Sequence, residues 1–195
     1  MNTSTSDSKS YDTATFYSIS NCQEGLSRVT LGNFLIKRVV YEIQEELPHI
    51  KNFGTLSPIP GFADWFSYLD EVKIKNILGN LKDKDVSFLK SKDFKLGDKR
   101  IVENKEVIIK LVAHYIVNEK NNKGLPLNDV SRFHLGNGAI VDDIIVNANV
   151  SEVGFKRSFG VMVNYLYELT NIEKNHEDYV NNNKIIVSNK IKKYL

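Results

Sequence analysis

The spacing of apolar residues changes twice between residues 16 and 57, and these changes constrain the fold more than any other feature of the sequence. Residues 16–20 (FYSIS) alternate apolar with polar side chains and are rich in aromatics, a pattern typical of a strand. From Leu31 to Leu47 the apolar residues recur every three to five positions, which indicates a helix with one buried face. Residues 53–57 then predict a second short strand, which ends at the prolines that follow because proline cannot donate to a ladder.

A strand, a helix and a second strand in this order predict a βαβ unit, whose crossover is right-handed in nearly all proteins. Both parallel strands then end at one edge of the sheet, where the helix begins near Thr30. The first helical turn has unpaired N–H groups that suit a phosphate, and Gly25 and Gly32 let the backbone approach one closely. The pattern predicts a phosphate site beside the hydroxyl of Ser57, although a glycine before a helix also fits a plain turn.

The rest of the sequence mixes helical and strand patterns. Helices are expected at residues 61–72, 107–117, 155–169 and 188–195, a strand at residues 139–149, and short amphipathic helices with a solvated face at residues 73–106. Strands mixed with helices predict an α/β or mixed α+β domain. Residues 1–14 are expected to form a flexible leader, since the chain begins with a stretch rich in serine and threonine.

Charge and composition exclude several classes of protein. The 26 basic residues nearly balance the 24 acidic ones, so no nucleic-acid partner is expected. No apolar run approaches the roughly 18–20 residues of a membrane span, so no membrane partner is expected. The single cysteine, Cys22, excludes a disulfide framework and a cysteine-based zinc site, which favours an intracellular protein and predicts no metal centre.

The four histidines differ in their surroundings. His49 follows a proline at a helix end, His114 lies within a buried-looking helix, and His176 lies in a charged segment without the spacing of metal ligands. His134 stands in residues 132–139 (RFHLGNGA), which we expect to be a turn that leads into a strand, between an aromatic residue and a Gly-Asn-Gly sequence. Such an imidazole is held in place and remains reachable, so His134 is the candidate catalytic histidine.

Several segments together resemble the malonyl-CoA decarboxylase family, in the family's order. They are residues 16–20 (FYSIS), 31–40 (LGNFLIKRVV), 56–62 (LSPIPGF), 133–139 (FHLGNGA), 162–169 (MVNYLYEL) and 172–177 (IEKNHE). LSPIPGF and FHLGNGA are long enough to be specific, and the matches run from about residue 14 to the C-terminus.

The resemblance implies an enzyme that converts malonyl-CoA to acetyl-CoA and carbon dioxide. It implies a GNAT-type acyltransferase fold with helical insertions, of which residues 15–195 form the C-terminal part of the catalytic domain. No metal or organic cofactor is expected, since the thioester carbonyl accepts the electrons left by carbon dioxide and CoA is part of the substrate. The expected compartment is the cytoplasm, with the mitochondrial matrix and the peroxisome as alternatives.

The resemblance also assigns site residues. Ser57 and His134 resemble the family's catalytic pair. From the chemistry of the reaction, we expect Ser57 to contact the malonyl carboxylate and accept a hydrogen bond or proton, and His134 to donate the proton to carbon. A loop resembles the stretch that holds the CoA pyrophosphate; it consists of Ser27, Arg28, Val29, Thr30, Leu31, Gly32 and Asn33. Further substrate-binding positions are Ser18, Asn137 and Tyr167.

The sequence also departs from the family pattern. Family members carry an N-terminal helical domain and opening strands before FYSIS, so we expect an exposed sheet edge here, and with it self-association or a companion chain that supplies the missing strands. Arg28 stands where the family usually has glycine, and Thr30 where it usually has glutamate. The segment that begins at Asp143 (residues 143–146, DIIV) stands where the family has Arg-x-Asn-Trp, which exchanges polar anchors for apolar residues. Two alternatives stay open: an inactive acyl-CoA-binding remnant, and an acyltransferase that uses the same fold with an amine acceptor.

Overall fold

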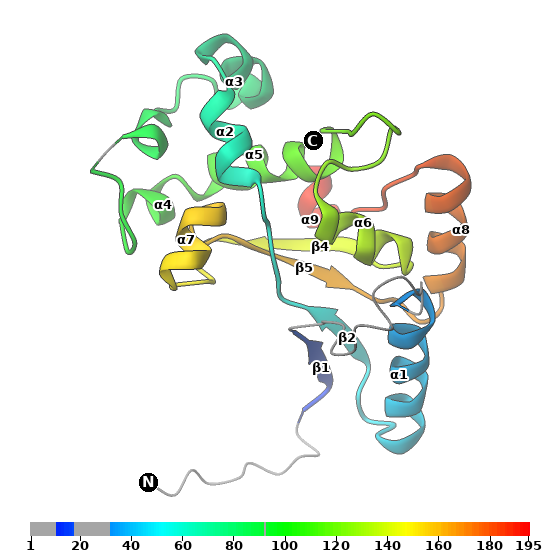
Figure 1. Ribbon diagram of the computed structural model, residues 1–195. Coiled ribbons are helices and arrows are strands. Elements are labelled where there is room, and N and C mark those ends of the chain that lie inside the picture. The colour runs from blue at the N-terminus through cyan, green and yellow to red at the C-terminus, as the bar shows by residue number, and fades with distance from the viewer. Residues whose placement is uncertain (1–10, 18–31, 92) are drawn as a thin grey trace, which may run out of the picture.

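A five-stranded mixed sheet organises the chain, and the computed structural model describes residues 11–17, 32–91 and 93–195 (Figure 1). The strands are β1 (Thr13–Phe16), β2 (Asn52–Thr55), β3 (Ser57–Pro58), β4 (Ile140–Ile145) and β5 (Met162–Leu166). β1 pairs with β2 in parallel, whereas β5 pairs antiparallel with β2, β3 and β4. β5 is therefore the strand around which the sheet is built.

Helices of the described residues surround this sheet. They are α1 (Gly32–Glu46), α2 (Phe62–Tyr68), α3 (Glu71–Leu78), α4 (Arg100–Glu103), α5 (Lys105–Val117), α6 (Asp129–Gly136), α7 (Glu152–Ser158), α8 (Ile172–Asn182) and α9 (Asn189–Lys192), with 3₁₀ turns at Gly79–Leu81 and Ser87–Lys90. α5 and α6 pack against β4, and α1 packs against α6. None of the helices within the described ranges has both the length and the apolar character needed to cross a bilayer.

The predicted βαβ unit is confirmed. β1 and β2 are parallel, with Thr13 opposite Asn52, and α1 connects them. β1 begins at Thr13, inside the stretch expected to be a leader, while residues 18–20 of the predicted strand lie outside the described residues. The predicted single strand at residues 53–57 is two strands, β2 and β3, and β3 includes Pro58. The mixed α/β class is confirmed, and the predicted helix at residues 107–117 is α5.

The helix predicted at residues 155–169 is wrong. α7 ends at Ser158 because Phe159 and Gly160 both take the left-handed conformation, with φ of 55° and 77°. The chain then enters β5, in which alternate side chains, those of Val163 and Tyr165, are buried on one face. The true period is two, and the aromatic side chains suit a pleated, buried strand.

The helix predicted at residues 61–72 is also wrong in extent. Leu69 has an extended backbone that ends α2, and Asp70 starts α3 as its N-cap, accepting a hydrogen bond from the backbone N–H of Lys73 at 2.8 Å. The strand predicted at residues 139–149 is β4, which ends earlier, at Ile145. The final predicted helix shortens to α9.

The core contains an aliphatic part and an aromatic part. Between the sheet and α5 and α6, fully buried aliphatic residues form the interior, among them Ile108, Leu111, Val141 and Val163. A second set consists of aromatic rings between α2, α7 and the loop before α4, and Figure 1 shows α2, α3 and α4 away from β1 and β2. The aliphatic part positions the end of β3 against α6, where the candidate site lies.

Candidate active site

Ser57 and His134 meet although 77 positions separate them in the sequence. Oγ of Ser57, on β3, lies 3.0 Å from Nε2 of His134, on α6, and the two residues are only 6% and 3% exposed. Ser57 pairs directly with Val163 of β5, so its side chain lies on the face of the sheet that α6 covers. The fold thus places the two predicted catalytic side chains within hydrogen-bond distance.

The predicted turn around His134 is wrong, because the histidine belongs to the last turn of α6. The turn follows four residues later, where Gly138 has φ of 82°. A Cβ on Gly138 would lie 2.1 Å from the backbone oxygen of Ile172, so only glycine fits against the start of α8. The glycines of FHLGNGA therefore lie where α6 ends, and Gly138 allows the start of α8 to pack closely against this turn.

Two tyrosines contact the imidazole, Tyr165 in β5 and Tyr167 directly after this strand. The ring of Tyr165 stacks on His134 with centroids 4.5 Å apart, and the hydroxyl of Tyr167 lies 2.8 Å from Nδ1. Tyr167 was expected near the site, and the structure places it there. Burial lowers the pKa of His134 to about 4, so the imidazole is neutral at neutral pH rather than titrating near it, as a solvated histidine does.

The contact with Tyr167 favours one tautomer of His134. A neutral imidazole carries one proton, on either nitrogen. Burial raises the pKa of Tyr167, so its hydroxyl keeps its proton, and Nδ1 of His134 is the acceptor within hydrogen-bond distance. We assign the proton of the imidazole to Nε2, where it points toward Oγ of Ser57. The serine oxygen thus receives a hydrogen bond, and its own proton remains free to donate.

Thr55 is a member of this group that the sequence analysis missed. Its Oγ1 lies 2.9 Å from Oγ of Ser57 and accepts a hydrogen bond from the backbone N–H of Tyr165 at 3.3 Å. The signal was present, because residues two apart along an extended chain point to the same face. Thr55 offers the Ser57 hydroxyl a partner when no ligand is bound.

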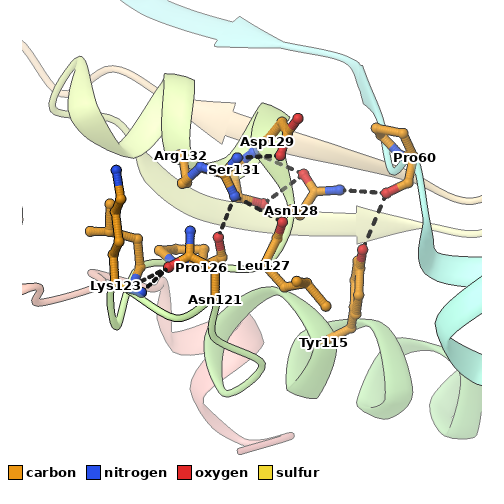
Figure 2. Close-up of polar contacts among 11 residues, drawn as sticks. Pro60, Tyr115, Asn121, Lys123, Pro126, Leu127, Asn128, Asp129, Ser131 and Arg132 are labelled. Carbon is orange, nitrogen blue, oxygen red and sulfur yellow. Dashed lines mark hydrogen bonds and ion pairs between the residues drawn. The ribbon is translucent and has the colours of Figure 1, made fainter.

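A second set of hydrogen bonds is centred on Asn128 (Figure 2). Asn128 is the N-cap of α6: its Oδ1 accepts from the backbone N–H of Ser131 at 2.9 Å and from the Ser131 hydroxyl at 3.0 Å. Its Nδ2 donates to the backbone oxygen of Pro60 at 2.8 Å, and that oxygen also accepts from the Tyr115 hydroxyl at 3.2 Å. The start of α6 is thereby bonded to the chain that follows Ser57.

The other predicted site residues are only partly described. Six of them lie outside the described residues, namely Ser18, Ser27, Arg28, Val29, Thr30 and Leu31. Gly32 and Asn33 are the first two residues of α1. Asn137 is fully buried at the end of α6, where its Nδ2 donates to the backbone oxygen of Phe133 at 2.7 Å and its Oδ1 has no partner among the described residues.

The described residues contain no group of three or more histidine, cysteine, aspartate or glutamate side chains that could hold a metal ion. The chemistry available at the pair is that of an imidazole and a polarised hydroxyl in a nearly buried site. Such a pair can donate hydrogen bonds to an anion and move a proton.

Comparisons with known proteins show the family to which the chain belongs. The family model "Malonyl-CoA decarboxylase C-terminal domain" matches residues 1–195. The chain is 35% identical over 205 residues to a mitochondrial malonyl-CoA decarboxylase of Anser anser anser, covering 96% of this chain and 40% of that protein. It is 37% identical over 196 residues to the corresponding protein of Rattus norvegicus, covering 91% and 40%.

Solved structures give the same result. The crystal structure of malonyl-CoA decarboxylase from Rhodopseudomonas palustris matches with a TM-score of 0.79 and 38% identity, over 95% of this chain and 43% of that one. The structure of the same enzyme from Cupriavidus metallidurans matches with a TM-score of 0.80 and 38% identity, over 94% and 48%. This chain thus spans about two fifths of its curated relatives and under half of these solved structures.

Fold and site together define a mixed α/β domain with a buried serine–histidine pair suited to acid–base chemistry. The chain belongs to the malonyl-CoA decarboxylase family and corresponds to its C-terminal domain.

Proposed function

We propose that this chain carries the catalytic pair of a carboxy-lyase that converts malonyl-CoA to acetyl-CoA and carbon dioxide. The observation that carries the proposal is the 3.0 Å hydrogen bond between Ser57 and His134 in a nearly buried site. The names of the relatives supply the substrate, and the pair supplies the two groups that the reaction needs: a donor for the carboxylate and a source of the proton.

The reaction breaks the bond between the α-carbon and the carboxylate. The electron pair left on the α-carbon passes to the thioester carbonyl, which becomes an enolate as carbon dioxide leaves. The enolate carbon then takes one proton, so each turnover consumes one proton. Because the thioester accepts the electrons, we propose that the reaction needs neither a metal nor an organic cofactor.

His134 is the proposed source of that proton. In the free protein its pKa is about 4, so the ring carries no charge at neutral pH. A bound malonyl carboxylate brings a negative charge next to the buried imidazole, and an opposite charge close by favours the imidazolium. The imidazole therefore takes up one proton from solvent when the substrate binds, and Nε2 passes a proton to the α-carbon once carbon dioxide has left.

Ser57 is the proposed contact for the carboxylate. Its oxygen accepts the hydrogen bond from Nε2 of His134, so its own proton is free to turn from Thr55 to the substrate. A hydroxyl whose oxygen already accepts a hydrogen bond is a stronger donor, because such chains polarise one another. Donation to an ionised carboxylate is also stronger than donation to the neutral Thr55 hydroxyl.

The remaining substrate contacts stay predictions. We propose that residues 27–33 and the start of α1 hold the CoA pyrophosphate, with Ser18, Asn137 and Tyr167 close to the malonyl group. A homo-oligomer or a companion chain that supplies further strands also remains our prediction. The word "mitochondrial" in the names of the relatives favours the matrix among the compartments considered.

The test is to incubate the purified 195-residue chain with malonyl-CoA and to follow acetyl-CoA. His134→Asn should lower kcat at least about a hundredfold with little change in CoA affinity, because general acid catalysis is lost while binding remains. His114→Asn is the matched control: this helical histidine stacks on Trp65 and lies 3.3 Å from Glu119, outside the site.

The outcomes separate the alternatives. An unchanged rate in His134→Asn contradicts the assigned role. A chain that gains thermal stability with CoA and makes no acetyl-CoA is the inactive remnant. Release of free CoA only when an amine is present identifies the acyltransferase.

A further inference from the structure

We infer that Asn128 is a positioning residue that aligns Ser57 with His134. This inference rests on the proposed function, and it concerns a residue outside every motif that carries the family resemblance. Asn128 bonds with one side-chain amide to both halves of the site: the segment that bears Ser57 and the helix that bears His134 (Figure 2). It is 2% exposed, so water does not compete for these hydrogen bonds.

The directions of these hydrogen bonds are determined. Oδ1 of Asn128 is an acceptor only, so the Ser131 hydroxyl donates to it. The Ser131 oxygen is then the acceptor for the hydroxyl of Tyr165, 2.7 Å away, whose proton is retained because burial raises its pKa. The ring of Tyr165 stacks on His134 with an interplanar angle of 22°. A chain of contacts thus connects Asn128 to the imidazole ring: Asn128 bonds to Ser131, Ser131 bonds to Tyr165, and Tyr165 stacks on His134.

On the other side, Asn128 holds the segment that follows Ser57. Its Nδ2 donates to the backbone oxygen of Pro60, three residues after the serine. Pro58 and Pro60 have their φ angles fixed by their rings. Gly61 has φ of 81°, and a Cβ there would lie 2.9 Å from the Tyr115 hydroxyl. A stiff segment transmits a displacement at Pro60 to Ser57, because few of its torsions can absorb the change.

Only an amide side chain of this length can both accept from the backbone N–H of Ser131 and donate to the backbone oxygen of Pro60. Aspartate would keep the N-cap acceptor but place a second oxygen against the backbone oxygen of Pro60. Serine would keep a capping oxygen but is too short and lacks the N–H donor. Asn128→Ser and Asn128→Asp therefore separate the N-cap of α6, which both keep, from the hydrogen bond to Pro60, which both lose.

The experiment measures kcat and KM for malonyl-CoA in Asn128→Ser and Asn128→Asp of the 195-residue chain. A misplacement of about 1 Å between reacting groups can cost on the order of a hundredfold in rate. We expect kcat to fall at least about tenfold in both variants while KM changes less than about twofold. Tyr115→Phe, which removes the weaker hydrogen bond to Pro60, should lower kcat by a smaller factor. Asp70→Ala, which removes the N-cap of α3, should leave kcat unchanged.

A second readout does not require turnover. The pKa of His134, measured by NMR of its ring nitrogens, should rise from about 4 toward that of a solvated histidine in Asn128→Ser, because the loosened site admits water. Wild-type kcat and an unchanged pKa in Asn128→Ser would overturn the inference. If the wild-type chain makes no acetyl-CoA, the proposed function fails, and the pKa of His134 in Asn128→Ser alone decides whether Asn128 positions the pair.

Discussion

The site and the helical segment of residues 62–103 are held together by different forces. At the site, buried polar side chains bond to one another: Thr55, Ser57, Asn128, Ser131 and His134 are all at most 6% exposed. In the helical segment most of the buried contacts are between aromatic rings. The rings are Phe62, Phe66, Phe88 and Phe94 of this segment, together with Phe155 of α7 and Phe159 at its end, against which they pack.

This difference predicts different consequences of mutation. Burial of apolar surface has no preferred direction, so a smaller ring costs stability roughly in proportion to the lost contacts and leaves distant geometry unchanged. A buried hydrogen bond has a direction, and removing one partner leaves the other unsatisfied and free to turn. Substitutions in the helical segment should therefore change stability, whereas substitutions at the site should change activity as well.

The largest expected effect on stability is that of Phe66→Ala. Phe66 is fully buried, and its ring packs edge-on against Phe159 with centroids 6.1 Å apart. Loss of the ring should lower the free energy of unfolding by about 4 kcal/mol, the usual cost of emptying such a position. Urea denaturation measures this loss, and kcat per folded molecule should match the wild type.

Phe66→Leu is the control, since it keeps most of the apolar volume and should cost about 1 kcal/mol. A fall in kcat per folded molecule in either variant of Phe66 would break the comparison, because it would mean that ring packing also sets the geometry of the site.

The next effect is the pH dependence that His134 confers on stability. Its pKa is about 4 when folded and about 6.5 when unfolded, so the unfolded state binds more protons between these values. Its contribution to stability is therefore fully present above about pH 6.5 and is lost as the pH falls toward 4, by roughly 3 kcal/mol. Urea denaturation at several pH values measures it against His134→Asn, which cannot titrate there.

If the wild-type chain and His134→Asn lose stability in parallel between pH 7 and 4, the imidazole is solvated and the contrast between the two regions weakens. A steeper loss in the wild-type chain supports a site without water. The aspartates and glutamates titrate in both proteins and cancel in the difference.

How far the sequence predicts this structure depends on whether local pattern or distant contact decides each element. α1 and α5 were predicted because their apolar residues recur at helical spacing, a signal that neighbouring residues of the sequence already contain. β5 was not, because its residues are also compatible with a helix, and its strand conformation is selected by pairing with β2, β3 and β4. The left-handed Phe159 that separates α7 from β5 has no local signature, as it is not a glycine.

The same distinction between local pattern and distant contact applies to the residues of the site. The pairing of Ser57 with His134 came from two motifs that resemble a family, since no local pattern connects positions 77 residues apart. Thr55 was within reach of strand periodicity. Asn128 could not be predicted in this way, because it donates a hydrogen bond to the backbone oxygen of Pro60, and no pattern of side chains indicates such a contact. The low pKa of His134 was also beyond the sequence, since it depends on how completely the neighbours cover the ring.

The smallest expected effect sharpens the comparison most, because it uses the same structural device in both regions. Asp70 caps α3 by accepting from Lys73 N–H, just as Asn128 caps α6. Asp70→Ala should cost about 1 kcal/mol in unfolding free energy and nothing in kcat, because its carboxylate bonds only to its own helix among the described residues. Denaturation and turnover measured on the same samples test this. If Asp70→Ala lowers kcat as much as Asn128→Ser does, then loss of any helix cap loosens the site, and the hydrogen bond to Pro60 has no special part in aligning Ser57 with His134.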